Sequence, residues 1–281
     1  MVRVDRESGL DLTEDRNLML MYPNHVRFVL LLLFALLAAP GLWAQAGPPF
    51  QTDDAVPVDY GHYEFYVFGL ADGTPVEMDV DAPAVEFNWG AYPKVQLHAI
   101  VPGGITAPMN HSAYGSEGQG PVTFGMGDIE LGVKYGAITE TKHRPQIGSF
   151  PLIEIPYNDK PSFLLPIWVS KSIGPWILDG GAGYVVNPQD GARNYPYGGF
   201  LVQHPVTKKL DLGVEIFSHG RTDQNVAVSQ SSTMIDAGGY YHFNSPGLQL
   251  LFAYGHSIAG QTETYAYLGL YKTWGKDKGK H

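Results

Sequence analysis

Hydrophobic and polar residues alternate along much of this chain. Residues 128–135 read Asp-Ile-Glu-Leu-Gly-Val-Lys-Tyr, so every second side chain is apolar and the others are charged or glycine. The same alternation recurs in 94–101, in 210–217 and, less regularly, in 235–243. A period of two is that of a β-strand with one apolar and one polar face. No stretch after residue 46 has a persuasive helical period, so we expect an all-β protein.

Turn residues divide the chain into about twelve such segments. Most are about 10–14 residues long, whereas soluble strands average about 5–6 and strands that cross a membrane need about 9–11. The predicted strands cover residues 60–70, 81–90, 93–102, 125–137, 145–156, 162–173, 174–187, 196–206, 209–219, 232–244, 247–258 and 262–274.

The connections between these strands tend to alternate in length. Tight turns fall at 90–93, 173–175, 205–209 and 244–247, and longer polar loops fall at 70–80, 103–124, 187–195 and 219–231. Segments 138–144 and 157–161 depart from this trend. Short turns at one end and long loops at the other are typical of an outer-membrane barrel. We therefore expect a twelve-stranded, antiparallel, up-and-down transmembrane β-barrel with both termini in the periplasm.

Aromatic residues favour this barrel over a soluble β-sandwich or a lipocalin-like barrel. They recur near strand ends, as expected for two interfacial girdles. The final strand also ends in an aromatic residue, which resembles the carboxy-terminal insertion signal of bacterial outer-membrane proteins. That match departs from the pattern at Lys272 and in the seven residues that follow the aromatic. The girdle candidates are Tyr60, Trp89, Tyr92, Tyr157, Trp176, Tyr184 and Trp274.

The first 46 residues have the features of a signal peptide. An apolar run at 28–39 follows Arg27, and a small-x-small cleavage pattern lies at Ala44-Gln45-Ala46. Twelve apolar residues are too few to span a bilayer as a helix, which needs about 20. Because residues 1–18 are long and acidic for such a signal, we expect translation to start at Met19 or Met21. The prediction is a signal peptide at 1–46 and one barrel domain at 47–281.

Composition narrows the classes further. The 281 residues include 34 Gly, 17 Tyr and no Cys, and the formal net charge is −10. A net negative chain is a poor nucleic-acid binder. Without Cys there is no disulfide or Cys-based zinc site, and we expect no cofactor. The expected partners are outer-membrane lipid, a small-molecule solute and the barrel-insertion machinery.

Several motifs, in this order along the chain, resemble one bacterial family. They are Gly47-Pro-Pro-Phe-Gln-Thr-Asp-Asp54, Tyr60-Gly-His-Tyr-Glu-Phe-Tyr66, 125–135, and Gly174-Pro-Trp176 through Gly180-Gly-Ala-Gly-Tyr184. The chain resembles, from about Gly47 to Trp274, the outer-membrane proteins labelled "MetA-pathway of phenol degradation". This resemblance implies a barrel that passes small, often aromatic, compounds, and it carries over no catalytic or ligand residues.

Few residues have a pattern expected of catalysis. The adjacent pairs Ser218-His219 and His256-Ser257 point to opposite faces of a strand, so neither pairs a nucleophile with its base. Asp79 and Asp81 lack the dense oxygen cluster that Ca²⁺ requires. We therefore expect no enzyme activity and no metal site, with a lipid-modifying hydrolase as the least favoured alternative.

The polar faces of the strands identify the predicted lumen. A Lys or Arg at the middle of the lipid face costs about 2–4 kcal/mol, so the charged side of each strand should face inward. Asp128 and Glu130, two residues apart, should point the same way, about 7 Å apart. The predicted lumen-lining residues are Glu64, Glu86, Asp128, Glu130, Asp211, Glu215 and Asp236, with Lys94 and Lys134 as their partners.

This lumen allows two interpretations. Barrels of about eight strands are filled by side chains and those of about sixteen hold open water, so twelve strands are compatible with a narrow polar passage. The charges are also compatible with a salt-bridged network that closes and stiffens the barrel. The favoured function is a narrow, cation-preferring channel or facilitator for small organic compounds. A non-conducting structural or adhesive barrel is the first alternative.

Overall fold

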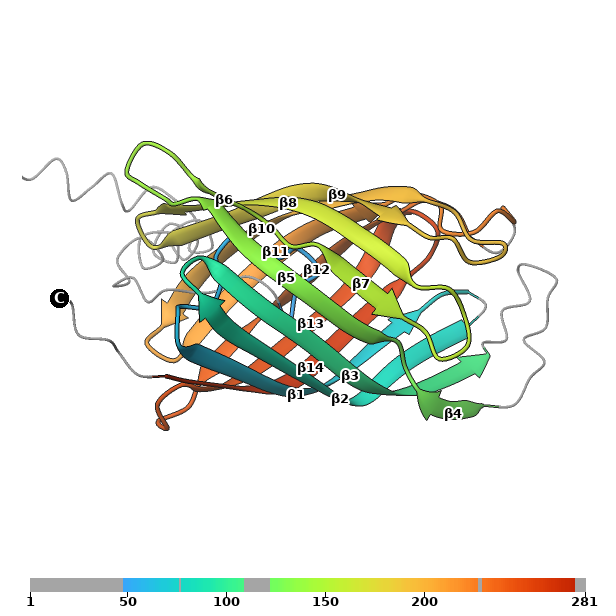
Figure 1. Ribbon diagram of the computed structural model, residues 1–281, viewed down its shortest axis with the longest axis horizontal. Helices are drawn as coiled ribbons and strands as arrows, with labels where there is room; N and C mark the ends of the chain where they lie inside the picture. Colours follow the sequence, from blue (N-terminus) through green and yellow to red (C-terminus); the bar gives the residue numbers. More distant parts are fainter. Residues whose placement is uncertain (1–47, 76, 109–121, 227–228, 276–281) are drawn as a thin grey trace, which may run out of the picture. The chain divides into compact units, whose positions relative to one another are not determined.

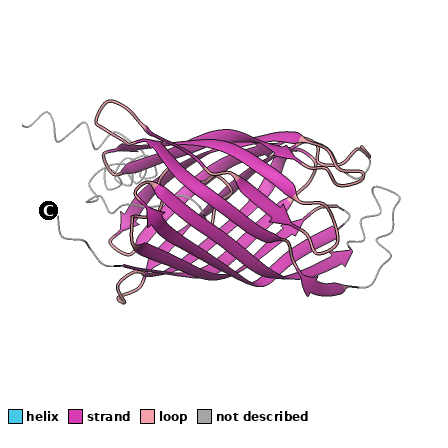
Figure 2. Ribbon diagram, in the orientation of Figure 1, coloured by secondary structure: helices cyan, strands magenta, loops and turns pink. Residues whose placement is uncertain are grey.

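The computed structural model describes residues 48–75, 77–108, 122–226 and 229–275. The predicted signal peptide at 1–46 lies outside these ranges, as do Met19 and Met21. No helix among the described residues is long and apolar enough to cross a membrane. Figure 2 shows that the described part of the chain consists of strands and the loops that join them.

The described residues form fourteen strands in chain order. They are β1 (His62–Gly73), β2 (Glu77–Tyr92), β3 (Val95–Pro108), β4 (Thr123–Met126), β5 (Ile129–Ile138), β6 (Gln146–Ser149), β7 (Leu152–Ile155), β8 (Ser162–Ile173), β9 (Trp176–Val186), β10 (Tyr195–Thr207), β11 (Leu210–His219), β12 (Ser232–His242), β13 (Leu248–Gly260) and β14 (Thr264–Gly275).

These strands close into a barrel. β3 pairs with both β4 and β5, so β4 and β5 together fill one place in the wall. β8 pairs with both β6 and β7, so β6 and β7 fill another. β14 pairs antiparallel with β1, from His62 opposite Gly275 to Gly73 opposite Thr264. The result is a closed antiparallel barrel with twelve strand positions, whose strands run obliquely across the wall in Figure 1. The predicted fold class is confirmed.

The predicted strand boundaries hold best where the alternation is regular. β8 spans the predicted 162–173, and most other strands differ by a few residues at their ends. The strands predicted at 125–137 and 145–156 are each divided in two. Pro151 separates β6 from β7 because proline has no N–H for the ladder. At the break between β4 and β5, a Cβ on Gly127 would lie 2.6 Å from Asp81 Oδ1, so this approach requires glycine.

Each strand keeps its two faces apart, as its sequence predicts. On β11 the side chains of Leu212, Val214 and Ile216 are exposed on the outside, whereas Asp211 and Glu215 are buried inside. The outward apolar side chains are those that a lipid bilayer would cover. Six of the seven girdle candidates are exposed on the barrel, and Trp176 is half-buried.

The strand connections differ at the two ends of the barrel. Residues 93–94, 174–175 and 208–209 join neighbouring strands by two-residue turns, whereas residues 187–194 form a longer connection between β9 and β10 at the other end. Lys94 departs from its predicted place in the lumen. It is exposed in the β2–β3 turn, with a backbone φ of 65°. The alternating pattern placed Lys94 on an inward strand face, but the residue belongs to a turn, where alternation does not determine the direction of a side chain.

The barrel also encloses a segment that precedes β1. We call residues 48–60 the inner segment. Its Phe50, Thr52 and Asp54 are buried, together with Ala55 and Val58. Phe50 belongs to the main apolar cluster of the interior, which it shares with side chains of β1, β2, β10 and β12–β14.

Candidate functional site in the barrel interior

The inner segment is hydrogen-bonded to β11 at Gln51 and Thr52. Glu215, almost fully buried, accepts hydrogen bonds through its carboxylate from the backbone N–H groups of Gln51 (3.0 Å to Oε2) and Thr52 (to Oε1). A hydrogen bond to a charged acceptor stabilises by about 1.5–3 kcal/mol. Two such bonds to one side chain therefore fix the segment to β11.

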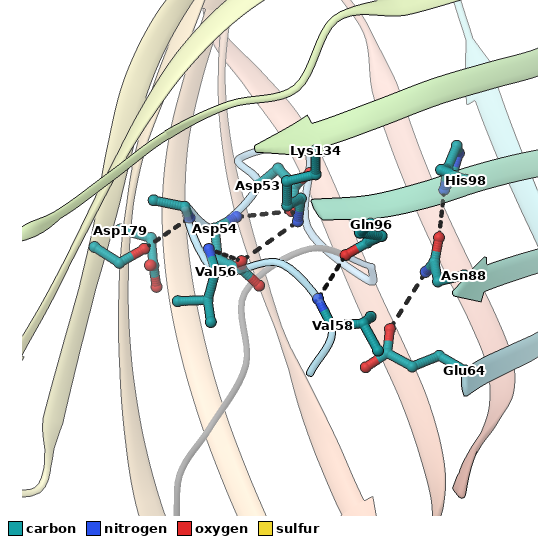
Figure 3. A network of polar contacts seen from close by, with 12 residues as sticks. Asp53, Asp54, Val56, Val58, Glu64, Asn88, Gln96, His98, Lys134 and Asp179 are labelled. Carbon is teal, nitrogen blue, oxygen red and sulfur yellow. Dashed lines mark hydrogen bonds and ion pairs between the residues drawn. The ribbon is translucent and has the colours of Figure 1, made fainter. Parts of the chain in front are cut away.

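A second contact fixes the inner segment to β5, across the barrel from β11. Lys134 Nζ lies 2.9 Å from Asp53 Oδ1 and 3.3 Å from Asp54 Oδ1. Figure 3 shows these three side chains together. The ammonium also stands 4.9 Å from the centroid of the Phe150 ring, a cation–π distance. Burial raises the pKa of Asp54 well above its ordinary value, with Lys134 opposing the shift and the nearby Asp53 carboxylate adding to it.

Backbone groups further along the inner segment are also paired with the wall. The N–H of Ala55 donates to Ser170 Oγ at 2.9 Å. The N–H of Val58 donates to Gln96 Oε1 at 2.9 Å (Figure 3). Tyr265 donates through its hydroxyl to the carbonyl of Pro49 at 2.8 Å. Buried backbone groups need such partners, and here inward-facing side chains of the strands supply them.

Glycines in the wall make room for the inner segment. A Cβ on Gly199 of β10 would collide with Thr52 Oγ1, and one on Gly213 of β11 would lie 2.7 Å from Phe50 Cζ. A Cβ on Gly148 of β6 would lie 2.6 Å from the carbonyl oxygen of Ala55. Part of the high glycine content therefore serves this close approach.

A separate polar network lines β1, β2, β3 and β5. Asn88 donates through Nδ2 to Glu86 Oε1 (2.8 Å) and Glu64 Oε2 (3.3 Å), and its Oδ1 lies 2.7 Å from His98 Nδ1. His98 Nε2 lies 2.7 Å from Glu130 Oε1. Since Asn88 Oδ1 is only an acceptor, His98 Nδ1 carries a proton. The network thus links three strand carboxylates through one imidazole and one amide.

The predicted lumen residues fall into three groups. Glu64, Glu86, Lys134, Asp211, Glu215 and Asp236 are buried side chains of the barrel interior, and Glu130 is half-buried there. Asp128 lies exposed in the break between β4 and β5, so it does not share a strand with Glu130 as expected. Lys94 lies in a turn. Whether any of these residues contacts a permeating solute stays a prediction.

The ion pairs differ from those expected. Lys134 binds Asp53 and Asp54 of the inner segment, which the sequence analysis did not single out as site residues. Asp211 is paired with His242 at 2.8 Å. Glu215 and Asp236 stand directly opposite each other on β11 and β12. The paired acids Asp53-Asp54, just before the first alternating strand, were the available signal.

The serine–histidine pairs do not form a nucleophile–base arrangement. Ser218 Oγ bonds to Thr233, whereas His219 Nε2 lies 2.9 Å from Glu263 Oε2. His256 Nδ1 lies 3.3 Å from Thr264 Oγ1. No group of three or more metal-ligating side chains is present in the ranges that the structure describes.

Several cavities lie among the described residues, and three of them share lining residues in the barrel interior. The outer cavity, about 790 Å³, includes Asp72, His219 and Glu263 in its lining. A side cavity of about 670 Å³ lies against β3, β4 and the start of β5. An inner cavity of about 250 Å³ lies beside the inner segment. The outer and side cavities share Asp79 and Glu154 in their linings, and the side and inner cavities share Ile100 and Glu130.

Comparison with solved structures shows the class of this fold. The chain is similar to an outer membrane channel from Pseudomonas putida F1, with a TM-score of 0.62 and 13% identity over 82% of this chain and 100% of that one. It is also similar to the translocator domain of the autotransporter NalP from Neisseria meningitidis (TM-score 0.52, 11% identity, 76% and 89% covered). The NanC porin gives a TM-score of 0.51 at 9% identity, with 74% and 98% covered.

The fold is therefore the closed barrel found in outer-membrane channels, porins and autotransporter translocators. No known protein family and no curated protein sequence matches the chain. The resemblance to the phenol-degradation family accordingly stays a prediction drawn from the sequence motifs.

Proposed function

We propose that this chain is an outer-membrane channel or facilitator for small organic compounds, with the inner segment narrowing its passage. Its apolar outer face supports the membrane location, because a closed barrel satisfies every ladder hydrogen bond internally and lipid can cover the exposed apolar side chains. The proposal includes export by the signal peptide at 1–46 and insertion by the barrel-insertion machinery.

The observation that carries the channel function is the chain of cavities inside a closed wall. Cavities of about 790, 670 and 250 Å³ share lining residues pairwise, so all three adjoin one another inside the barrel. A barrel whose interior served only for stability would be filled by side chains to ordinary packing density. The resemblance to the phenol-degradation family supports aromatic compounds among the solutes.

Reconstitution tests this function. Full-length protein purified from outer membranes should migrate differently on a gel before and after boiling, as a closed barrel does. In planar bilayers it should give single-channel currents, and in liposomes it should admit small aromatic solutes faster than protein-free controls. Recovery as a soluble periplasmic protein would contradict the location, and liposomes no more permeable than the controls would contradict the channel.

A non-conducting structural barrel is the second candidate, and the inner segment favours it. Glu215 and Lys134 hold the segment from opposite strands, and both of these side chains are buried. If the segment never moves and solutes cannot pass beside it, the barrel is closed. The wild-type protein separates the two functions, because it conducts only if it is a channel. Variants that release the segment should conduct in either case, so they serve as the positive control.

A further inference from the structure

The inner cavity combines carboxylates with an aromatic wall. Its volume is about 250 Å³, somewhat below the 300–1,000 Å³ that is typical for drug-sized ligands. Phe50, Tyr66, Phe150 and Trp168 contribute to its apolar side, and Glu64, Glu86, Glu130 and Asp53 to its acidic side. Such a lining suits a small molecule that has both an apolar body and a positively charged group.

One carboxylate of this lining has an unmet acceptor. Glu86 is 2% exposed, and its Oε2 atom is buried without any hydrogen-bond partner. The nearest protein donors are committed elsewhere. Asn88 Nδ2 already donates to Glu86 Oε1 and to Glu64 Oε2, and His98 faces Asn88 and Glu130. A buried acceptor left in this way costs about 1–3 kcal/mol, which a ligand with N–H donors would recover.

The cations of the cavity do not balance its acids. Lys134 is held by Asp53 and Asp54, so its charge is matched by the inner segment. His98 remains beside Glu86 and Glu130, 3.5 Å and 2.7 Å away. With Glu64 also in the lining, the strand carboxylates outnumber the single imidazole. The cavity is therefore a favourable place for one additional cation.

The aromatic wall adds to this preference. Ring faces attract ammonium groups, by about 0.5–2 kcal/mol depending on desolvation. Phe150 already shows this contact with the Lys134 ammonium at 4.9 Å from its centroid. Trp168, 3% exposed, and Tyr66, 5% exposed, provide further buried ring surface. An alkyl or aryl group placed against these rings would also leave water.

The side cavity provides a route with the same electrostatic preference. Its lining includes Asp79, Asp81, Asp128, Glu130 and Glu154, and none of the described residues that line it is Lys, Arg or His. Acidic linings with low-dielectric walls concentrate cations. Glu130 and Ile100 belong to both cavities, so a cation that enters the side cavity meets the inner one at Glu130.

We propose that the inner cavity binds a small protonated amine with an apolar or aromatic body, whose ammonium group donates to Glu86 and Glu130. If the bound amine is also the transported solute, this assignment names a solute class for the proposed channel. Only that step rests on the proposed function, and the binding site itself does not. The aromatic side chains contact the body, and the side cavity leads the amine to Glu130.

Equilibrium binding tests this site on the full-length purified barrel in non-ionic detergent. Isothermal titration calorimetry compares 2-phenylethylamine, protonated at neutral pH, with 2-phenylethanol and phenylacetate. We expect the amine to bind about tenfold or more tightly than the alcohol, which is about 1.4 kcal/mol, and phenylacetate to show no binding. Equal binding of amine and alcohol, or no binding of the amine, would overturn the proposal whatever the variants do.

The variants locate the site. Glu86→Gln should raise the Kd of the amine about tenfold and leave that of the alcohol unchanged, and Glu130→Gln provides a second test if the first variant does not fold. Asp190→Asn is the matched control, because it removes one charge from an exposed side chain paired with Lys160. Amine affinity unchanged in a folded Glu86→Gln or Glu130→Gln barrel would place the binding elsewhere and overturn the assignment.

Binding and passage fail independently. A protein that admits neutral aromatics into liposomes but binds no amine retains the channel function and loses this site. A protein that binds the amine but conducts nothing retains the site and loses the channel.

Discussion

The ammonium of Lys134 on β5 lies 2.9 Å from the carboxylate of Asp53, which belongs to the segment inside the barrel. This pair joins the wall to the inner segment in a place where both groups are largely hidden from water. Breaking a buried ion pair by removing one partner costs about 3–5 kcal/mol, because the other charge is left unpaired. The position of the inner segment therefore depends strongly on Lys134.

Replacing Lys134 with methionine should release the inner segment. The variant leaves Asp53 and Asp54 without their cation inside the barrel, so we expect the segment to leave its docked position and single-channel conductance to rise several-fold. The wall should persist, as shown by an unchanged heat shift on a gel. Lys160→Met is the matched control, since Lys160 pairs with Asp190 at an exposed site. Equal currents in wild type and Lys134→Met would show that this pair does not hold the segment.

Glu215→Gln should loosen the other attachment of the inner segment. The amide keeps the shape of Glu215 but loses the charge that strengthens the bonds from Gln51 and Thr52. We expect a loss of about 1–3 kcal/mol in docking, seen as more frequent brief openings in bilayer recordings. Asp211→Asn on the same strand is the control, because Asp211 binds His242 and not the segment. If both variants show the same frequency of brief openings, the effect comes from any change on β11 and not from the bonds to the inner segment.

A methyl group at Gly199 should displace the inner segment without removing any polar contact. The Cβ of Gly199→Ala would collide with Thr52 Oγ1 and approach Phe217 Cδ2 to 2.8 Å. Over-packing costs about 1–3 kcal/mol, so the variant should conduct more than the wild type. Gly125→Ala is the control, because nothing lies within 4 Å of a Cβ there. A Gly199→Ala barrel as silent as Gly125→Ala would mean that the segment adjusts in place.

The alternation in the sequence was sufficient to predict the wall. Side chains of β11 obey it from Asp211 to Ile216, because charge on the lipid side is costly and the period of a strand is fixed. The alternation predicted strands or faces wrongly where a proline or a turn changes the backbone. Pro151 interrupts the ladder between β6 and β7, and Lys94 lies in a turn with a positive φ, so its parity says nothing about the lumen.

The inner segment was not predictable from alternation. Residues 48–60 make their contacts with side chains far away in sequence, 81 positions in the pair Asp53–Lys134 and 163 in the pair Thr52–Glu215. Such contacts leave no local period. The traces that they do leave are Gly199 and Gly213 on inward positions of strands, where a side chain would otherwise fill the lumen. Inward glycines opposite a segment rich in Pro and Asp are thus a usable signal in related barrels.

Docking of the inner segment should weaken as pH rises. Burial raises the pKa of Asp54 above its ordinary value, so the docked state favours protonated Asp54 over the ionised form. The stabilisation is full at low pH and is lost as pH rises through the raised pKa. As pH rises through this raised pKa, wild-type conductance should increase more than that of Asp54→Asn, which cannot ionise.

Comparing the slope of conductance against pH in the wild type and in Asp54→Asn cancels the contribution of other titrating groups. Asp53, Lys134 and Asp179 surround Asp54, and they are present in both proteins. Asp59→Asn changes an exposed acid of the same segment and should keep the wild-type slope. Parallel slopes for wild type and Asp54→Asn would exclude Asp54 as the source of the pH dependence.

Ion preference should depend on the acids of the side cavity. Asp128 and Glu130 lie on different sides of the β4–β5 break, yet both line this cavity together with Asp79, Asp81 and Glu154. A carboxylate-lined passage concentrates cations and repels anions. Under a tenfold salt gradient, the wild-type reversal potential should therefore indicate cation preference. The double variant Asp128→Asn with Glu130→Gln should move it toward zero, because two of the five acids become neutral while the apolar lining is unchanged. Asp190→Asn, at an exposed loop, should leave the reversal potential where it was. If the double variant conducts with wild-type selectivity, ions do not cross the barrel through the side cavity.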